Sequence, residues 1–218
     1  MGLYCNPLMS EKAREELKYC IENVHILKTN FVGTFAGAIS GKGVDDAMPC
    51  FKEYFSELSN MAEANGVKIG IENAPMYGHW YAATCNIGFC PRAWEKMFDA
   101  VDSDALGLEW EPSHQWQQLI DPLAQLKEWG RKVFHVHGKD AHVDMEHIRK
   151  YGVRFGEQYC VHRFPGMGDA DWKEIIRILN TQGYQGDITV EGYHDPVYCK
   201  ERELEGQKLA LDYLRSCV

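Results

Sequence analysis

The sequence predicts an α/β fold in which parallel strands are joined by helices. Two observations support this prediction: short apolar runs alternate with longer segments of helical period, and several of the runs end in an acidic residue or a histidine. The 218 residues are 45% hydrophobic and 25% charged, which is typical of a globular domain with a sizeable core. We therefore expect one domain over residues 1–218.

Six apolar runs are predicted to be the strands, because each is short and each is followed by a segment with helical spacing. They cover residues 2–6, 31–35, 67–72, 105–111, 132–137 and 187–191. The sequence therefore predicts six βα units.

The segments between these runs carry helix-starting and helix-ending residues. Ser10 is a predicted N-cap, and Gly66 ends the second helix. Pro91 and Pro122 stand where two further helices begin. The apolar stripes that face the core are Leu17, Cys20, Ile21 and Val24; Phe51, Tyr54, Phe55 and Leu58; Trp94, Met97, Phe98 and Val101; and Trp172, Ile175, Ile176 and Leu179. Residues 141–168 are irregular, and a stretch of this length is expected to be a functional loop over a site.

Charge and cysteine content narrow the possible partners. The chain has 32 acidic and 23 basic residues, and its net charge of -9 disfavours a nucleic acid as the main partner. Its eight cysteines are scattered and form no CxxC pair, which is typical of reduced thiols. No apolar run approaches the roughly 20 residues that span a bilayer. We expect a soluble, cytoplasmic protein that acts on a small molecule and has no membrane partner.

Four of the predicted strands end in, or run directly into, residues that bind cations. These segments are IGIEN (69–73), LGLEWEPSH (106–114), VFHVH (133–137) and ITVEG (188–192), and their candidate ligands are Glu72, Glu111, His137 and Glu191. Functional groups gather at the carboxyl ends of parallel strands, so four strands can deliver these side chains to one point. Strand alternation agrees, since each candidate opposes the apolar residues of its own strand.

Three carboxylates and one imidazole form an oxygen-rich set that suits one divalent manganese, magnesium, cobalt or zinc ion. Burying three carboxylates together without a cation would cost several kcal/mol per charge. A single glutamate at a strand end is more often a solvated residue or a helix cap, and a lone strand histidine is more often a core residue. Four candidates at matching positions make a shared ion the simpler explanation.

A set of motifs spread over essentially the whole chain carries a specific resemblance. The motifs are NPL near the start, VGTFAG (32–37), GIENAPM (70–76), EPSH (111–114), VFHVHGKDA (133–141), FPGMGDADW (164–172) and GYQGDITVEG (183–192). Together they resemble the sugar phosphate isomerase/epimerase family, the xylose isomerase-like barrels that include ketose 3-epimerases. The resemblance implies a TIM-type (β/α) barrel.

The resemblance also implies roles for individual residues. His114 is expected beside the substrate, and the residues that match the family's four metal ligands are Glu72, Glu111, His137 and Glu191. The family usually has aspartate where Glu111 stands, and because glutamate reaches one methylene further, the metal position is expected to shift or to tighten differently. Lys139 and Asp140 match a Lys-Asp pair of the family, which suggests Lys139 as a substrate contact and Asp140 as its structural partner.

The resemblance further implies an incomplete barrel. Family members have eight strands in about 250 residues, whereas this chain aligns by motif from their third strand, so the first two βα units are expected to be missing. An open barrel has two unpaired edges, at the first and last strands, and such edges invite pairing with another chain. We therefore expect either a truncated chain or gene model, or a homo-oligomer in which another copy covers the open edges.

The predicted chemistry is epimerisation or isomerisation of a sugar, with or without a phosphate, through an enediolate. The ion polarises a carbonyl, and a carboxylate removes the proton from the neighbouring carbon. Glu72 and Glu191 are the expected pair, one removing the proton and the other returning it. His114 and His135 are expected to orient substrate oxygens. Arg163 is a candidate contact for an anionic or hydroxyl-rich end of the substrate, with a surface ion pair as the alternative.

Two other functions remain open. An abasic-site endonuclease of the endonuclease IV type has a similar barrel, but that chemistry normally uses more metal ligands and a basic surface that faces DNA. A barrel remnant without two of its units could instead be a binding module without turnover. Four further histidines are expected to be solvated residues: His142, His147, His162 and His194.

Overall fold

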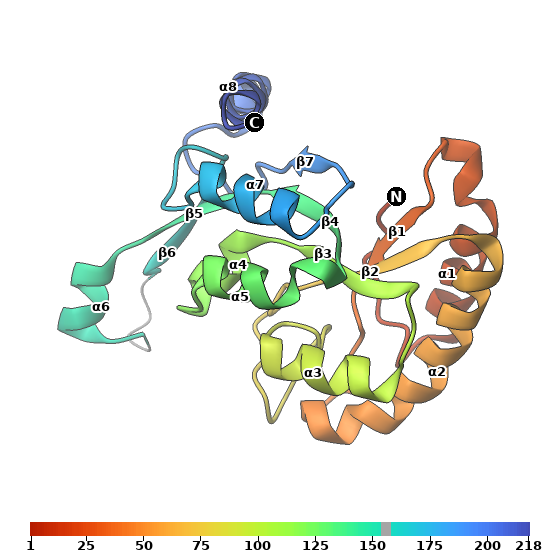
Figure 1. Cartoon of the computed structure of the whole chain (residues 1–218). Helices are drawn as coiled ribbons and strands as arrows, with labels where there is room; N and C mark the ends of the chain where they lie inside the picture. Colours follow the sequence, from red (N-terminus) through yellow and green to blue (C-terminus); the bar gives the residue numbers. More distant parts are fainter. Residues whose placement is uncertain (154–157) are drawn as a thin grey trace. The chain divides into compact units, whose positions relative to one another are not determined.

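The computed structural model of this chain describes residues 1–153 and 158–218. Its main feature is a five-stranded sheet with the strand order β1-β2-β3-β4-β7 (Figure 1). The strands are β1 (Phe31–Thr34), β2 (Lys68–Glu72), β3 (Leu106–Trp110), β4 (Val133–Gly138) and β7 (Ile188–Val190). β1 pairs with β2, β2 with β3, and β4 with β7, all in parallel. The predicted α/β fold with a parallel sheet is confirmed.

The chain forms two compact units, which are described one at a time. Unit 1 comprises residues 1–110 and 132–135. Unit 2 comprises residues 111–131 and the described part of 136–218. The division falls inside β4, whose first three residues belong to unit 1 and whose last three belong to unit 2.

Unit 1 carries three helices and one short 3-10 helix, namely α1 (Glu11–Asn23), η1 (Val24–Leu27), α2 (Val44–Asn65) and α3 (Pro91–Ala100). Ser10 caps α1 by accepting a hydrogen bond from the Ala13 amide at 3.1 Å. Gly66 ends α2 in the left-handed region, where a residue without a β-carbon meets no steric penalty. α1 packs against α2 (Figure 1), and the stacked rings of Phe51 and Phe55 on α2 are fully buried.

A row of glycines crosses the three complete strands of unit 1. Gly33 on β1 pairs in register with Gly70 on β2, and Gly70 pairs with Gly107 on β3. A methyl group built on Gly33 would overlap the carboxylate of Glu109, and one built on Gly70 would overlap the ring of Phe31. The row therefore provides the space in which larger side chains of neighbouring strands lie.

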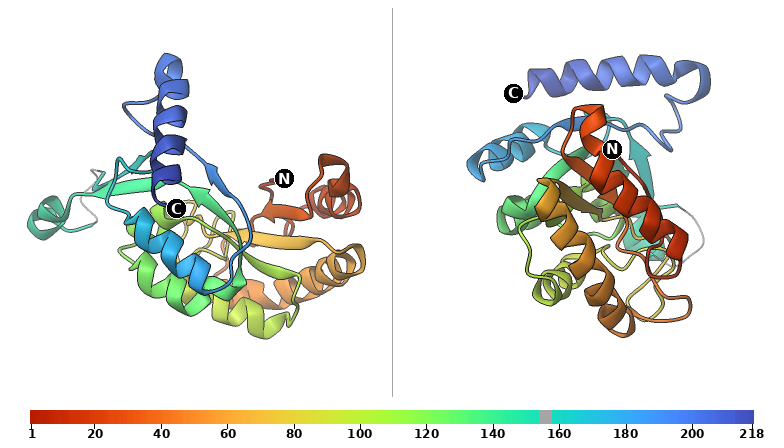
Figure 2. Two further views of the ribbon diagram at one scale, coloured as in Figure 1. Left: turned by 45° about the horizontal axis from the view of Figure 1, so that its top comes forward. Right: turned by 90° about the vertical axis from the view of Figure 1, so that its right-hand side faces the viewer.

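Unit 2 carries the remaining elements. They are α4 (Pro112–Gln117), α5 (Pro122–Trp129), β5 (Asp140–Val143), α6 (Met145–Tyr151), β6 (Cys160–Arg163), α7 (Trp172–Thr181), η3 (Lys200–Arg202) and α8 (Glu203–Ser216), with η2 (Gly130–Lys132) at the border of the two units. α5 packs against α7, and α8 lies beside β7 (Figure 2). The predicted stripe of α7 is buried, as an amphipathic helix against a sheet requires.

Two predictions of secondary structure are wrong. Residues 2–6 form no strand: Gly2 makes one isolated bridge to Gly33, and the chain then leaves β1. The side chain of Asn6 instead bonds both backbone groups of Ala38, and Pro7 has no amide hydrogen with which to extend a ladder.

The stretch 141–168 is more regular than predicted. β5 and β6 pair in antiparallel fashion, and Asp144 caps the intervening α6 by accepting from the His147 amide at 2.8 Å. Residues 154–157 of this stretch lie outside the described residues. None of the described helices has both the length and the apolar character needed to cross a bilayer.

Candidate metal centre

Three of the predicted ligands meet in unit 2. Glu111 directly follows β3 and precedes α4, His137 lies in β4, and Glu191 is the first residue after β7. The Nδ1 atom of His137 lies 3.2 Å from Glu191 Oε2 and 3.5 Å from Glu111 Oε2. Three different segments of the chain thus bring two carboxylates and one imidazole to the same point.

Lys139 joins the same group two residues after His137. Its ammonium nitrogen lies 2.7 Å from Glu191 Oε1 and 3.5 Å from Glu111 Oε1. The Lys139 amide donates to His137 O at 2.9 Å, so the backbone turns sharply at the end of β4 and directs both side chains to these carboxylates. The residue is only 3% exposed, and the ammonium therefore offsets buried negative charge.

Glu111 is fully buried, and its charged neighbours decide its protonation. Burial by itself would raise the pKa of the Glu111 carboxyl, but the electrostatic effects of the nearby His114 and Lys139 side chains outweigh burial and hold that pKa well below its ordinary value. His114 Nε2 lies 3.3 Å from Glu111 Oε1, and a contact of His114 with substrate stays a prediction. Burial lowers the pKa of His114, against the opposing effect of the Glu111 carboxylate.

Two residues outside the predicted site also belong to this group. Ser113, on the first turn of α4, donates its hydroxyl hydrogen bond to Glu111 Oε1. His162, on β6, has its Nδ1 atom 3.1 Å from Ser113 Oγ. His162 is therefore not the solvated residue that was expected. Burial, with Lys139 nearby, lowers the pKa of His162 to about 4. The sequence signal that could have pointed to Ser113 is its hydroxyl side chain, two positions after the candidate ligand Glu111.

Asp140 anchors the segment that follows β6. Its two carboxylate oxygens accept hydrogen bonds from the amides of Gly166 and Ala170 and from the indole of Trp172, as well as from the next amide in the chain. Burial raises the pKa of Asp140 against the opposing effect of these donors. The contacts of Asp140 fix the loop FPGMGDA in place, whereas its pairing with Lys139 stays a prediction.

Arg163 forms the ion pair that was the alternative to a substrate contact, but with a buried partner. Its Nε atom donates to Asp195 Oδ2 at 2.9 Å, and Asp195 is 2% exposed. Asp195 also accepts from the amides of Phe164, Val197 and Tyr198. Burial alone would raise the pKa of Asp195, but these donors lower it below its ordinary value. A substrate contact by Arg163 stays a prediction.

Unit 1 holds Glu72, His135 and a second buried glutamate, Glu109. Glu72 ends β2 and stands in register beside Glu109 of β3, so two carboxylates occupy neighbouring strands. Tyr4 donates its hydroxyl to Glu109 Oε2 at 3.0 Å. Asn86 fixes the end of β2 by donating to Glu72 O at 2.8 Å. Glu109 is not among the predicted site residues, although it lies two positions before Glu111 and so shares its face of the strand.

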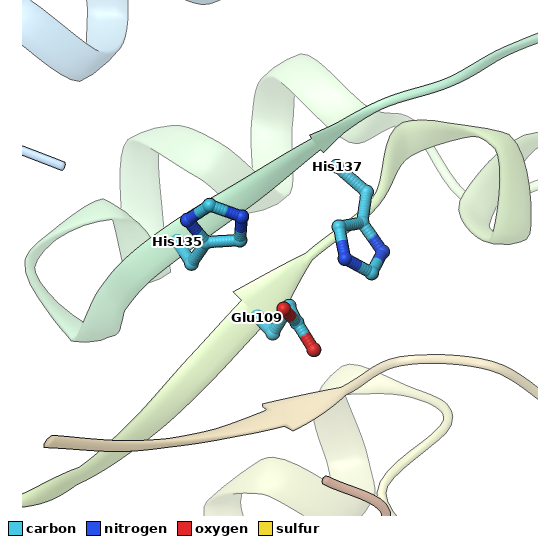
Figure 3. Close-up of side chains that lie close together, drawn as sticks. All are labelled: Glu109, His135 and His137. Atoms are coloured by element: carbon cyan, nitrogen blue, oxygen red, sulfur yellow. The ribbon is translucent and has the colours of Figure 1, made fainter. Parts of the chain in front are cut away.

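His135 stands on β4 and stacks on Phe31, with ring centroids 4.9 Å apart. Glu109 and His135 each offer a ligand atom within 4.8 Å of the other. Figure 3 shows the two side chains together with His137, which follows His135 on the same face of β4. His135 therefore lies beside an acidic group, and its contact with substrate stays a prediction.

The donor set of unit 2 fits a divalent cation. Metal–ligand bonds of about 2 Å place two donors of one ion about 3 Å apart, close to the separations between His137 and the two carboxylates. Glu191 Oε2 is buried and accepts no hydrogen bond within the part of the chain that the structure describes. Such an oxygen is costly unless a cation or another donor satisfies it. Glu72 belongs to unit 1, and its part in this donor set stays a prediction.

Comparison with known proteins relates the chain to a family of barrels. The sequence model of the family described as "Xylose isomerase-like TIM barrel" matches residues 5–217. An inosose dehydratase from Klebsiella pneumoniae strain 342 is 25% identical over 205 residues, which cover 85% of this chain and 65% of the relative. The chain thus spans less than two thirds of that relative's length.

Solved structures agree in fold. The structure of L-ribulose 3-epimerase matches with a TM-score of 0.67 at 16% identity, covering 99% of this chain and 74% of the other. The crystal structure of the IolI protein with a bound zinc atom matches with a TM-score of 0.70 at 19% identity, covering 100% of this chain and 75% of the other. At such identities these likenesses show the fold alone.

Proposed function

Because this chain belongs to the xylose isomerase-like TIM barrel family, we propose that it is a metal-dependent enzyme that moves a proton next to the carbonyl of a sugar or related polyol, as an epimerase or isomerase. The observation that carries the proposal is the meeting of Glu111, His137 and Glu191 within unit 2. Relatives named as an inosose dehydratase and an L-ribulose 3-epimerase support a carbohydrate-like substrate.

The proposed ligands of one divalent ion are Glu111, His137, Glu191 and, from the end of β2, Glu72. Burial of Glu72 beside Glu109 supports its inclusion, since two neighbouring carboxylates favour a cation. The oxygen-rich set suits manganese, magnesium, cobalt or zinc, and the zinc of the IolI structure supports a divalent ion. When bound, the ion would polarise the substrate carbonyl and stabilise the negative charge of an enediolate.

The chain's own carboxylates would move the proton. Glu191 is the proposed base that removes the proton beside the carbonyl, and Glu72 is the proposed acid that returns one. Return to the opposite face of the same carbon gives an epimer, whereas return to the neighbouring carbon gives an aldose–ketose isomer. Lys139, with its ammonium 2.7 Å from Glu191 Oε1, holds that carboxylate in one orientation and is a candidate contact for a substrate oxygen.

Three further residues are proposed to bind the substrate. His114 lies beside Glu111 with its side chain largely buried, which suits a hydrogen bond to a substrate hydroxyl. His135, on the face of β4 that also carries His137, is proposed to orient a second oxygen. Arg163 keeps guanidinium hydrogens beyond the one that Asp195 takes, and these would bind a hydroxyl-rich or anionic end of the substrate.

A dehydratase is the second candidate, and the match to an inosose dehydratase favours it. Both reactions begin when a carboxylate removes the proton next to the carbonyl. In a dehydration, the electron pair left on that carbon then forms a carbon–carbon double bond as hydroxide departs from the next carbon and takes up a proton to become water. The product therefore separates the two candidates.

Deuterium exchange tests the proposal. The full chain, loaded with manganese or zinc, is incubated in D₂O with ketoses, their phosphates and inososes, and the products are followed by NMR and mass spectrometry. Deuterium beside the carbonyl of an epimer or isomer supports the proposal, and a product lighter by one water supports the dehydratase. Exchange must stop after chelation with EDTA. Metal binding without exchange on any substrate would favour a binding module, and cleavage of abasic DNA would favour the endonuclease.

A further inference from the structure

The two oxygens of Glu111 have different neighbours. Oε2 faces Nδ1 of His137 at 3.5 Å, on the side where the ion is proposed. Oε1 accepts the hydroxyl hydrogen bond of Ser113, and it lies 3.3 Å from His114 Nε2 and 3.5 Å from the ammonium nitrogen of Lys139. One oxygen is thus held by the protein while the other is presented to the proposed cation.

The direction of the hydrogen bonds follows from the chemistry of the groups. An ionised carboxylate only accepts hydrogen bonds, so Ser113 uses its single hydroxyl hydrogen on Glu111. Ser113 Oγ can then only accept from His162, whose Nδ1 lies 3.1 Å away. His162 must therefore carry its proton on Nδ1, which leaves Nε2 as the bare nitrogen of a neutral ring.

The surroundings of His162 agree with this assignment. His162 is paired in register with Ala141 across β5 and β6, so the strand fixes where the ring stands. Burial and the nearby ammonium of Lys139 keep the pKa of His162 near 4, and the ring is neutral at ordinary pH. A neutral ring with one N–H supplies the single donor that Ser113 requires.

We propose that Ser113 and His162 are positioning residues, and that the chain from His162 Nδ1–H through Ser113 Oγ–H to Glu111 Oε1 fixes the carboxylate of Glu111 for a divalent cation. This inference rests on the proposed function, because it assumes the metal site. The inference also explains how a glutamate can serve as a metal ligand at position 111. Its extra methylene adds a rotatable bond compared with aspartate, and the hydrogen-bond chain restricts rotation about that bond.

Four variants of the 218-residue chain test the proposal by manganese affinity, measured by calorimetry. Ser113→Ala and His162→Phe interrupt the hydrogen-bond chain. Both should weaken manganese binding about 10-fold to 100-fold, which is the usual effect of losing a partner that orients a metal ligand. Ser113→Thr keeps the hydroxyl, and His162→Asn keeps a donor near the position of Nδ1, so both should bind within about 3-fold of wild type. His142→Phe is the matched control, since His142 lies exposed on the neighbouring strand.

A second measurement tests the hydrogen-bond chain in the absence of any metal, by the protonation of the His162 ring. In ¹H–¹⁵N NMR spectra of the wild-type protein, the ring of His162 should be protonated on Nδ1, and Ser113→Ala should shift it towards the Nε2 form. Wild-type manganese affinity in both Ser113→Ala and His162→Phe, or an Nε2-protonated ring in the wild type, would overturn the inference while leaving the metal site intact. A wild-type protein that binds no divalent ion would overturn the proposed function and this inference with it.

Discussion

Lys139 and Glu191 form an ion pair within unit 2, with Lys139 Nζ 2.7 Å from Glu191 Oε1. The same ammonium lies 3.5 Å from Glu111, so one buried cation serves two of the proposed ligands. Without an ion, Lys139 is the group that makes the shared burial of these carboxylates tolerable. We therefore expect the protein to fold in the absence of the proposed ion, with Lys139 contributing to its stability in that state.

Replacement of Lys139 by methionine tests this role. Lys139→Met should lower the free energy of unfolding by about 2 kcal/mol in EDTA, because it leaves two carboxylates without their cation. Manganese should reduce the loss, since the ion supplies the missing positive charge. Urea denaturation with EDTA and with manganese measures both values. Lys173→Met, an exposed site on α7, is the control. Equal stability of Lys139→Met and wild type in EDTA would contradict the prediction.

Replacement of Glu191 by glutamine separates catalysis from folding. Glu191→Gln removes the proposed base but keeps the size of the side chain, so deuterium exchange into the substrate should fall by about 100-fold or more. Circular dichroism and the urea midpoint should stay close to wild type, because Glu191 is 28% exposed at its side chain. Glu201→Gln, at an exposed position in η3, controls for loss of one charge. An undiminished rate in Glu191→Gln would remove that residue from the mechanism.

Asp140 should be one of the most sensitive positions for stability. Asp140→Asn replaces one of two accepting oxygens by a donor that would face other donors, the Gly166 amide and the Trp172 indole among them. We expect a loss of about 3 kcal/mol in the free energy of unfolding. Asp187→Asn, at an exposed residue before β7, should change it by less than about 0.5 kcal/mol. Similar urea midpoints for the two variants would show that the loop does not depend on Asp140.

His162 should give the protein a defined sensitivity to acid. Folding lowers the pKa of His162 from 6.5 to about 4. Between these pH values, the imidazole is protonated in the unfolded chain but stays neutral in the folded protein. Stability is therefore lost as the pH falls from 6.5 towards 4, by about 2 kcal/mol between about pH 7 and about pH 5. Urea denaturation of wild type and His162→Gln at both pH values measures the effect. The loss over this range should be smaller in His162→Gln, and identical losses would rule out His162 as its source.

Local sequence patterns were sufficient to predict the positions of β2, β3 and β4. A strand that helices cover is apolar over its whole length, so it can be identified without knowing which strand it pairs with. The ends of β2, β3 and β4 lie within one or two residues of the predicted positions. The β5 and β6 pair was missed because it joins Asp140 to Arg163 across an intervening helix. Such a pairing depends on contacts far apart in the sequence, and short polar strands carry little signal of their own.

The site shows the same contrast. The proximity of Glu111, His137 and Glu191 could be predicted because each lies near or just after the end of an apolar strand, and the topology brings these ends together. The contact between Ser113 and His162 could not be predicted, since it joins α4 to β6 and no local spacing indicates it. Motifs locate the charged groups of a site well, whereas the neutral groups that orient them become visible only in three dimensions.

The glycine row of Gly33, Gly70 and Gly107 limits which side chains β1, β2 and β3 can carry at these positions. At Gly107 even the smallest replacement would place a methyl group against the backbone carbonyl of Lys132, which cannot move aside as the end of a flexible side chain can. Larger residues at Gly107 therefore require the backbone of β3 and β4 to separate, and this glycine row fixes how closely the neighbouring strands can lie.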